Sequence, residues 1–168
     1  VISDPNLPTT AVIDLEVGTS VFVWTVDNGP CANGITTDTM EVRVFDEHNP
    51  PANAGPDKEL CTPNTSLTLS GSSVTAPAVG TWTVQQGAGV FADEHASNTT
   101  VSGLAVGVNI LRWTVSNGPC ESGLSFDEVI ITVFDETNPI ANAGPDQNLC
   151  TPNTTTTMAG SALIFPAT

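Results

Sequence analysis

Short runs of alternating apolar and polar residues recur along the chain, and glycine, proline, asparagine and serine separate them. In an extended strand every second side chain lies on the same face, so these runs predict β-strands with one buried face. None of them has the 3.6-residue period and the cap residues of a helix. Between residues 50 and 139 the pattern predicts seven strands, near residues 58–60, 66–70, 80–85, 89–92, 99–102, 108–115 and 128–134.

The last two of these runs indicate which side chains face the core. In the sixth run the apolar face comprises Leu111, Trp113 and Val115. The opposite face carries Arg112, which we expect to stay in water. In the seventh run the apolar face comprises Val129, Ile131 and Val133. Seven short strands of this kind predict an all-β fold, a two-sheet β-sandwich of immunoglobulin-like type.

The chain repeats itself at an offset of 89 residues. The string Asn-Gly-Pro-Cys ends at Cys31 and again at Cys120, and 120 − 31 = 89. The string Ala-Asn-Ala-Gly-Pro-Asp occupies residues 52–57 and 141–146 at the same offset. The apolar face of the sixth run has a counterpart in Phe22, Trp24 and Val26. A unit of this size is a domain with its own core, because solenoid repeats are about 20–50 residues long.

Asn-Pro pairs at residues 49–50 and 138–139, each followed by a Gly-Pro turn, mark the linkers between repeats. These linkers divide the chain into three parts. They are the C-terminal half of a repeat (1–49), a complete β-sandwich repeat (50–139) and the N-terminal part of a third repeat (140–168).

The chain is therefore expected to be a window on a tandem array, with a broken repeat at each end. Residues 140–168 followed by 1–50 would rebuild one repeat that lacks only the equivalents of residues 80–89. Either the chain is part of a longer filament, or successive chains complete each other's broken repeat. We favour the first interpretation, because broken repeats would expose unpaired strand edges.

Four strings carry a family resemblance: Ala-Asn-Ala-Gly-Pro-Asp at 52–57, Gly-Thr-Trp-Thr-Val at 80–84, Arg-Trp-Thr-Val-Ser-Asn-Gly at 112–118 and Asp-Glu-Val-Ile-Ile-Thr-Val at 127–133. They resemble the PKD-like and immunoglobulin-like tandem repeats of giant Bacteroidetes cell-surface adhesins, including the SprB-type adhesin of gliding cells. The resemblance implies export to the cell surface by the type IX route and a role in attachment or gliding motility. The Trp-Asp-Phe-Gly-Asp-Gly segment of typical PKD domains is missing from the sequence, so properties tied to it do not carry over.

The charge balance excludes several partners. The chain has 168 residues, with 18 Asp and Glu against 3 Lys and Arg, and its formal net charge is −15. Binding to nucleic acid or to an anionic membrane surface requires clustered Lys and Arg, so we expect neither partner. No apolar run of 18 residues is present, so we also expect no membrane insertion. The expected partners are neighbouring repeats of the same protein, with surface polysaccharide or the substratum as further possibilities.

The four cysteines fall into two kinds by their place in the repeat. Cys61 and Cys150 precede the second strand, whereas Cys31 and Cys120 follow the sixth. Disulfides are the expected state in an exported protein. The simplest pairing joins Cys61 to Cys120 within one repeat and leaves Cys31 and Cys150 to partners in neighbouring repeats. A competing pairing joins neighbouring repeats throughout, because in immunoglobulin topology the two turns lie at opposite poles. Free thiols are the third possibility.

The linkers combine carboxylates and amides, the oxygen ligands that Ca²⁺ prefers. Calcium at these junctions would stiffen an array, and no other cofactor is expected. The alternative is that these residues are solvated turn formers, since Asp, Asn and Pro favour turns for backbone reasons alone. The candidate ligands are Asp46, Glu47, Asn49, Asn53 and Asp57, and in the second copy Asp135, Glu136, Asn138, Asn142 and Asp146.

The sequence offers little support for catalysis. His48 lies in a linker, and His95 has Asn6 as its counterpart in the other copy. Only one carboxylate of the Asp93-Glu94 pair recurs, whereas a glycosidase needs two that face one cleft. We therefore expect no enzyme activity. The chain has three tryptophans, Trp24, Trp82 and Trp113. They could in principle stack on sugars, but we expect them in the core.

Thr39 is a candidate glycosylation site, because Asp38-Thr39-Met40 resembles the short O-glycan acceptor motif of exported Bacteroidetes proteins. Two function classes remain. In the first, the repeats are structural stalk or spacer segments of a long extracellular filament. In the second, each repeat binds carbohydrate or a surface weakly and multiplicity supplies avidity; a spacer attached to a secreted hydrolase is a further variant. The sequence favours the stalk, because identity between the copies is concentrated in turns and linkers.

Overall fold

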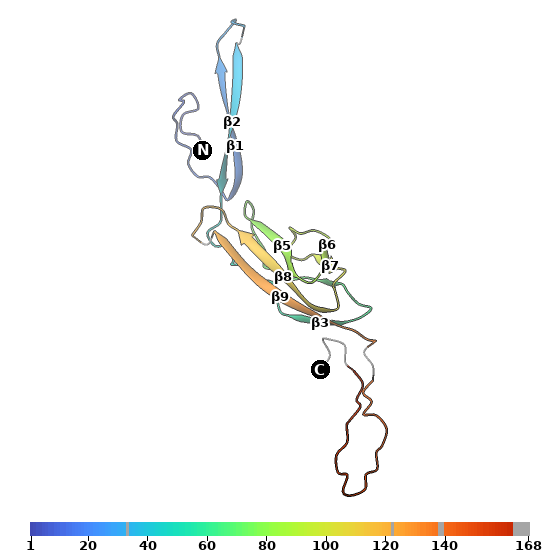
Figure 1. Cartoon of the computed structure of the whole chain (residues 1–168). Coiled ribbons are helices and arrows are strands. Elements are labelled where there is room, and N and C mark those ends of the chain that lie inside the picture. Colours follow the sequence, from blue (N-terminus) through green and yellow to red (C-terminus); the bar gives the residue numbers. More distant parts are fainter. Residues whose placement is uncertain (33, 122, 138–139, 163–168) are drawn as a thin grey trace.

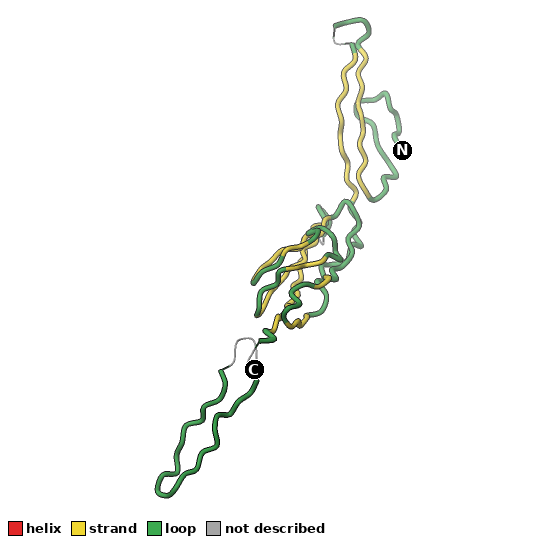
Figure 2. Tube along the Cα trace, turned by 90° about the vertical axis from the view of Figure 1, so that its right-hand side faces the viewer, coloured by secondary structure: helices red, strands yellow, loops and turns green. Residues whose placement is uncertain are grey.

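The computed structural model describes residues 1–32, 34–121, 123–137 and 140–162. Its elements follow one another along an elongated molecule, with a long hairpin first, a sandwich in the middle and an extended loop last (Figures 1 and 2). Within these residues there is no helix, and so none that is long and apolar enough to cross a membrane. The all-β prediction is confirmed.

The sandwich in the middle consists of two sheets. The four-stranded sheet has the order β3-β9-β8-β5, with bounds Lys58–Cys61, Leu124–Phe134, Gly107–Ser116 and Val79–Gln86. The three-stranded sheet has the order β4-β7-β6, with bounds Leu67–Thr68, Thr100–Ser102 and Val90–Phe91. All pairs are antiparallel except β3 with β9, which is parallel. This three-on-four arrangement confirms the immunoglobulin-like β-sandwich.

The seven strands lie where the alternation predicted them, but β9 begins earlier. It starts at Leu124 rather than near residue 128, because β8 and β9 pair without interruption as far as Ser116 and Leu124. The long β8–β9 hairpin thus extends the sandwich toward the hairpin of the first 49 residues, as Figure 1 shows.

The core lies between the two sheets and confirms the predicted apolar faces. Trp82 and Trp113 are opposite each other on β5 and β8, and their ring centroids are 5.0 Å apart. Gly80 leaves room for the Trp113 ring, since a Cβ at that position would overlap it. The buried apolar side chains around this pair include Leu69, Val101, Leu104, Leu111, Val115, Val129, Ile131 and Val133.

The first 49 residues reproduce the back half of the sandwich without its front. β1 (Gly18–Asp27) and β2 (Ile35–Val44) form an antiparallel hairpin, and the bounds of β1 become those of β8 when 89 is added. An isolated bridge between Ile2 and Val12 occupies the positions of the Phe91–Val101 pair of β6 and β7.

Trp24 therefore lies on an incompletely covered face, and the prediction that it is buried is wrong for this chain. Its side chain is 41% exposed, whereas Trp113 at the equivalent position is 0% exposed. The cause is that residues 1–32 and 34–49 supply no equivalents of β3, β4 and β5 to cover this hairpin.

The third part, residues 140–162, forms an extended loop without strands (Figure 2). It nevertheless keeps local contacts of the sandwich at an offset of 89 residues. The Ser161 amide donates to the Asn142 carbonyl at 2.8 Å, as the Ser72 amide does to the Asn53 carbonyl at 2.8 Å. The local turn geometry is thus independent of the rest of the repeat.

A matched pair of substitutions tests the half-built character of residues 1–49. Trp113→Ala should destabilise the sandwich by about 3–5 kcal/mol, because it removes a fully buried ring. Trp24→Ala, at the equivalent position, should leave the main unfolding transition unchanged. Denaturant unfolding of both variants measures this, and equal losses would contradict the assignment of the core.

Candidate functional site: the junction between repeats

The linker from β2 to β3, residues 45–57, is bound to the sandwich along much of its length. The amides of Ala52 and Ala54 donate to Ser125 Oγ at 2.8 Å and to Asp127 Oδ2 at 2.9 Å. Further along, Asp57 Oδ1 accepts from the Ile130 amide at 2.8 Å. The linker therefore runs beside β9, and polar side chains replace the backbone partners that a regular strand would supply.

Asn49 and Asn117 form a buried amide pair at the centre of the junction. Asn49 Nδ2 donates to Asn117 Oδ1 at 3.1 Å, and Asn117 Nδ2 donates to the Asp46 carbonyl at 2.9 Å. Asn49 also exchanges hydrogen bonds with the backbone of Thr75, accepting at 2.8 Å and donating at 3.2 Å. The two residues are only 6% and 1% exposed. The pair joins the linker to the β8–β9 turn and to the loop before β5.

Phe45 and Gly118 form the apolar part of the same junction. Gly118 has a φ of 60°, and a Cβ built on it would lie 2.5 Å from Phe45 Cζ. Glycine is thus required twice, for the left-handed backbone and for the close approach of the ring. The first residue of the linker therefore packs directly on the turn of the following repeat.

The candidate calcium ligands of the first linker have other roles in the structure. Asp46 Oδ1 accepts from the His48 amide at 2.9 Å, and Asn53 Oδ1 accepts from the Gly55 amide at 2.8 Å. Asn49 is buried in the amide pair, Asp57 accepts from the Ile130 amide within β9, and Glu47 has an exposed side chain. Among the described residues, no three His, Cys, Asp or Glu side chains are grouped as a metal site. Most of these side chains thus accept hydrogen bonds from backbone amides.

The second linker shows the same turn chemistry. Asp135 Oδ1 accepts from the Thr137 hydroxyl at 2.7 Å and from the Thr137 amide at 2.8 Å. The Asn142 side chain accepts from Gly144, whereas Glu136 and Asp146 are exposed. Asn138 lies outside the described residues.

The hydrogen bonds at Asp135 shift its titration. The Thr137 hydroxyl, followed by the Thr137 amide and then Thr62, lowers the pKa of Asp135 below its ordinary value, although slight desolvation opposes the shift. Since the folded-state pKa is depressed, this carboxylate favours the folded turn above its unfolded pKa. That contribution is lost as the pH falls through the folded pKa.

The cysteine geometry corrects the simplest disulfide pairing. In the β-sheet, Cys61 on β3 lies beside Phe134 at the end of β9. Cys120 lies before the start of β9 at Leu124. Ten steps along β9 separate the two ends by about 30 Å. A disulfide needs Cα atoms within about 7 Å, so a bridge between Cys61 and Cys120 does not fit this sandwich. All four cysteines, Cys31, Cys61, Cys120 and Cys150, are free thiols in the structure.

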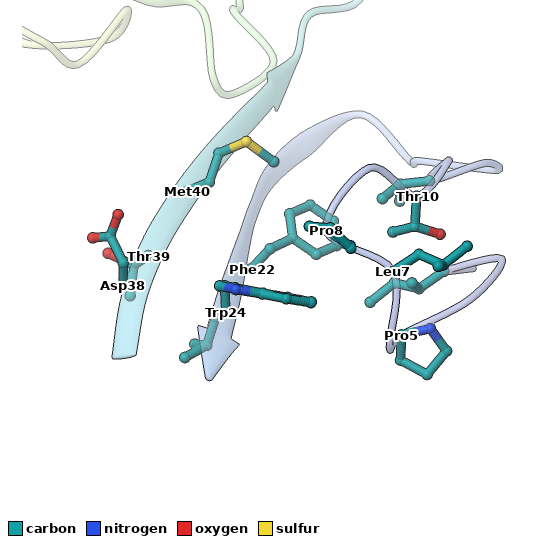
Figure 3. A pocket seen from close by; sticks show the side chains of 12 residues that line it. Pro5, Leu7, Pro8, Thr10, Phe22, Trp24, Asp38, Thr39 and Met40 are labelled. Atoms are coloured by element: carbon teal, nitrogen blue, oxygen red, sulfur yellow. The ribbon is translucent and has the colours of Figure 1, made fainter. Parts of the chain in front are cut away.

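The other candidate residues are separate from the junction. Thr39 lies on β2 opposite Val23 with an exposed side chain, so it is accessible to modification. Phe22 and Trp24 lie beside a hollow lined by Pro5, Leu7 and other residues of the N-terminal segment (Figure 3). In the complete repeat the equivalent face is core, which makes this hollow an unfinished core.

His95 holds a loop in place rather than belonging to a catalytic group. Its Nδ1 lies 3.0 Å from the Gly80 carbonyl and 3.3 Å from Thr81 Oγ1, and its amide donates to Asp93 Oδ1 at 2.9 Å. The Asp93-Glu94 pair lies in the same exposed loop.

Two structural asparagines were missed from the sequence. Asn117 recurs as Asn28 in the Asn-Gly-Pro-Cys string, so its repetition was a usable signal. Asn109 is fully buried, and its side chain bonds the backbone of Ala88, Ala105, Gly107 and Ile131. Its counterpart is Ser20, so repetition could not have revealed it.

Removal of the buried amide pair should weaken the docked linker. Asn49→Ala leaves the buried groups of Asn117 and Thr75 without partners, which should lower the free energy of unfolding by about 1–3 kcal/mol. His48→Ala is the control, because its side chain is 94% exposed and its loss should cost less than about 0.5 kcal/mol. Urea unfolding compares the two, and equal effects would argue against a docked linker.

The titration of Asp135 is directly measurable by NMR of the carboxyl carbon. We expect a pKa below about 3.9, the ordinary value for aspartate. Thr137→Val removes the hydroxyl donor and should move the pKa of Asp135 upward. An unchanged Asp135 titration in the variant would refute the assigned cause.

The solved structures that are similar to this chain include two PKD domains. The first is described as the solution structure of the PKD domain from KIAA 1837 protein. It is 34% identical with a TM-score of 0.44, and the match covers 55% of this chain and 93% of that chain. The second is the PKD domain (329-428) from human KIAA0319, 21% identical with a TM-score of 0.41, covering 58% and 87%. No protein-family model and no curated protein matches the chain.

Proposed function

We propose that the chain is a structural segment of a long extracellular cell-surface adhesin filament, in which tandem sandwiches act as a stalk or spacer in attachment or gliding. The observation that carries the proposal is the docked junction. A flexible tether would leave the linker solvated, whereas here its backbone is bonded to the following sandwich at Ser125, Asp127 and Asn117. Such a junction transmits orientation from one repeat to the next, which is what a stalk requires.

The arrangement of chain ends within a repeat also supports a stalk. The linker enters the sandwich at the pole that carries the β8–β9 turn and leaves it after Phe134, at the far end of β9 (Figure 1). Each repeat therefore adds its full strand length, about 30 Å, to the array. The proposal includes export by the type IX route and calcium at the linkers.

The alternative function, weak multivalent binding of carbohydrate, draws on the exposed Trp24. Aromatic rings in a shallow hollow are suited to stack on sugars. However, the equivalent Trp113 is buried in the complete repeat, so an array of complete repeats would present no such ring. The stalk is therefore the better supported function.

Small-angle X-ray scattering of the full chain under reducing conditions tests the stalk. We expect an elongated particle with a narrow distribution of shapes, because the junction is docked. The double variant Asn49→Ala/Asn117→Ala should broaden that distribution, and His48→Ala should not. A wild-type chain as flexible as the double variant would contradict the proposal. Saturable binding of the chain on a glycan array would favour the carbohydrate-binding alternative.

A further inference from the structure

Cys120 lies at the junction where the linker enters the repeat. Its amide is 3.4 Å from the Asn117 carbonyl, and Asn117 bonds the Asp46 carbonyl. Gly118, two residues before Cys120, is in contact with the Phe45 ring. The half-buried Cys120 therefore belongs to a turn that packs against the end of the preceding repeat.

Cys61 lies at the opposite pole, where the linker leaves the repeat. It is in register with Phe134, and the next residue, Thr62, donates its amide to the Phe134 carbonyl at 2.9 Å. Thr62 Oγ1 also accepts from the Glu136 amide at 2.9 Å. The exposed Cys61 is thus attached to the first residues of the next linker.

The side chain of Cys61 shares a face with Phe134. Leu60 and Val133, one position earlier on the two strands, pack in the core. Because side chains alternate along a strand, Cys61 and Phe134 both point away from the core, to the outer face of the sheet. Neighbouring strands are about 4.8 Å apart, which places the Cys61 backbone beside that of Phe134.

The 89-residue repeat relates the surroundings of Cys120 to those of Cys61. Phe45 and Phe134 are equivalent, since 45 + 89 = 134. The Gly-Pro-Cys turn of the repeat that follows Phe134 should therefore contact Phe134 as Gly118 contacts Phe45. The cysteine of that turn and Cys61 would then approach the same phenylalanine from two sides. A disulfide between them requires their Cα atoms to lie within about 4.4–6.8 Å of each other, and this shared contact brings the two cysteines to the same place.

We propose that a disulfide closes each junction, joining the Cys61-type cysteine of one repeat to the Asn-Gly-Pro-Cys cysteine of the next. By equivalence, Cys150 also pairs with the following repeat, whereas Cys31 and Cys120 pair with the preceding one. The Sγ–Sγ bond forms as two S–H bonds are lost. Two electrons and two protons pass to a low-molecular-weight disulfide, which is reduced to two thiols.

The inference rests on the tandem arrangement of the proposed function and adds a covalent bond to it. The hydrogen-bonded junction alone can open under load, whereas a bridged junction can separate only as far as the disulfide permits. The bridge also spans the linker, so that tension passes from the end of one sandwich directly to the next.

The first test uses the chain as it is. The chain is oxidised with glutathione disulfide, and linked peptides of the monomer are identified by mass spectrometry. We expect no peptide that links Cys61 to Cys120, because the two residues lie at opposite poles. Such a linked peptide would overturn the proposal.

The second test completes the third repeat. Thr168 is equivalent to residue 79, so a copy of residues 80–139 added after Thr168 restores a whole repeat beyond Cys61. The change Cys120→Ser in the original copy makes the added Asn-Gly-Pro-Cys cysteine distinguishable. We expect oxidation to link Cys61 to this cysteine, with both thiols lost. Cys150→Ser should leave the link intact, and Cys61→Ser should abolish it.

A free Cys61 in the oxidised, extended chain would overturn the proposal. Tryptophan fluorescence of each variant confirms that the sandwich is folded, which is expected because the side chain of Cys61 is exposed. The result is separable from the scattering test of the stalk. A stiff junction with free thiols would retain the proposed function and reject the disulfide.

Discussion

The buried amide pair of Asn49 and Asn117 is the interaction on which the junction depends. A chain segment that leaves one sheet and enters another has backbone groups with no ladder partner, and unpaired buried groups are costly. Here the Asn117 side chain donates a hydrogen bond to the Asp46 carbonyl, and the Asn49 side chain exchanges hydrogen bonds with the backbone of Thr75. The linker is therefore ordered by the repeat that follows it.

Because the linker depends on the repeat that follows it, the two ends of a repeat are not equivalent. The N-terminal segment of residues 50–139 is hydrogen-bonded to β9, through Ser125, Asp127 and the Ile130 amide. Residues 140–162 have the same turns but no such partner, and they form an extended loop. The difference shows that the linker is held by side chains from the second half of the repeat that follows it, rather than by its local turns.

Much of the fold could be predicted from the sequence, because alternation reports directly on which face is buried. The faces of Trp113 and Ile131 were correct for that reason. Trp24 has the same pattern but remains exposed, since burial also requires strands that supply the opposite sheet. A pattern predicts which face can be buried, and tertiary contacts determine whether it is.

The junction was harder to predict, because the same residue types serve solvation, metal binding and backbone capping. Asn49 and Asp57 were candidate ligands, yet one is a buried amide partner and the other accepts from the Ile130 amide. The disulfide pairing depended on the poles of the sandwich, which the spacing of Cys61 and Cys120 along the chain does not reveal. The parallel pairing of β3 with β9 places Cys61 at the exit of the repeat, whereas the β8–β9 turn keeps Cys120 at its entrance, so the two lie too far apart to pair within one repeat.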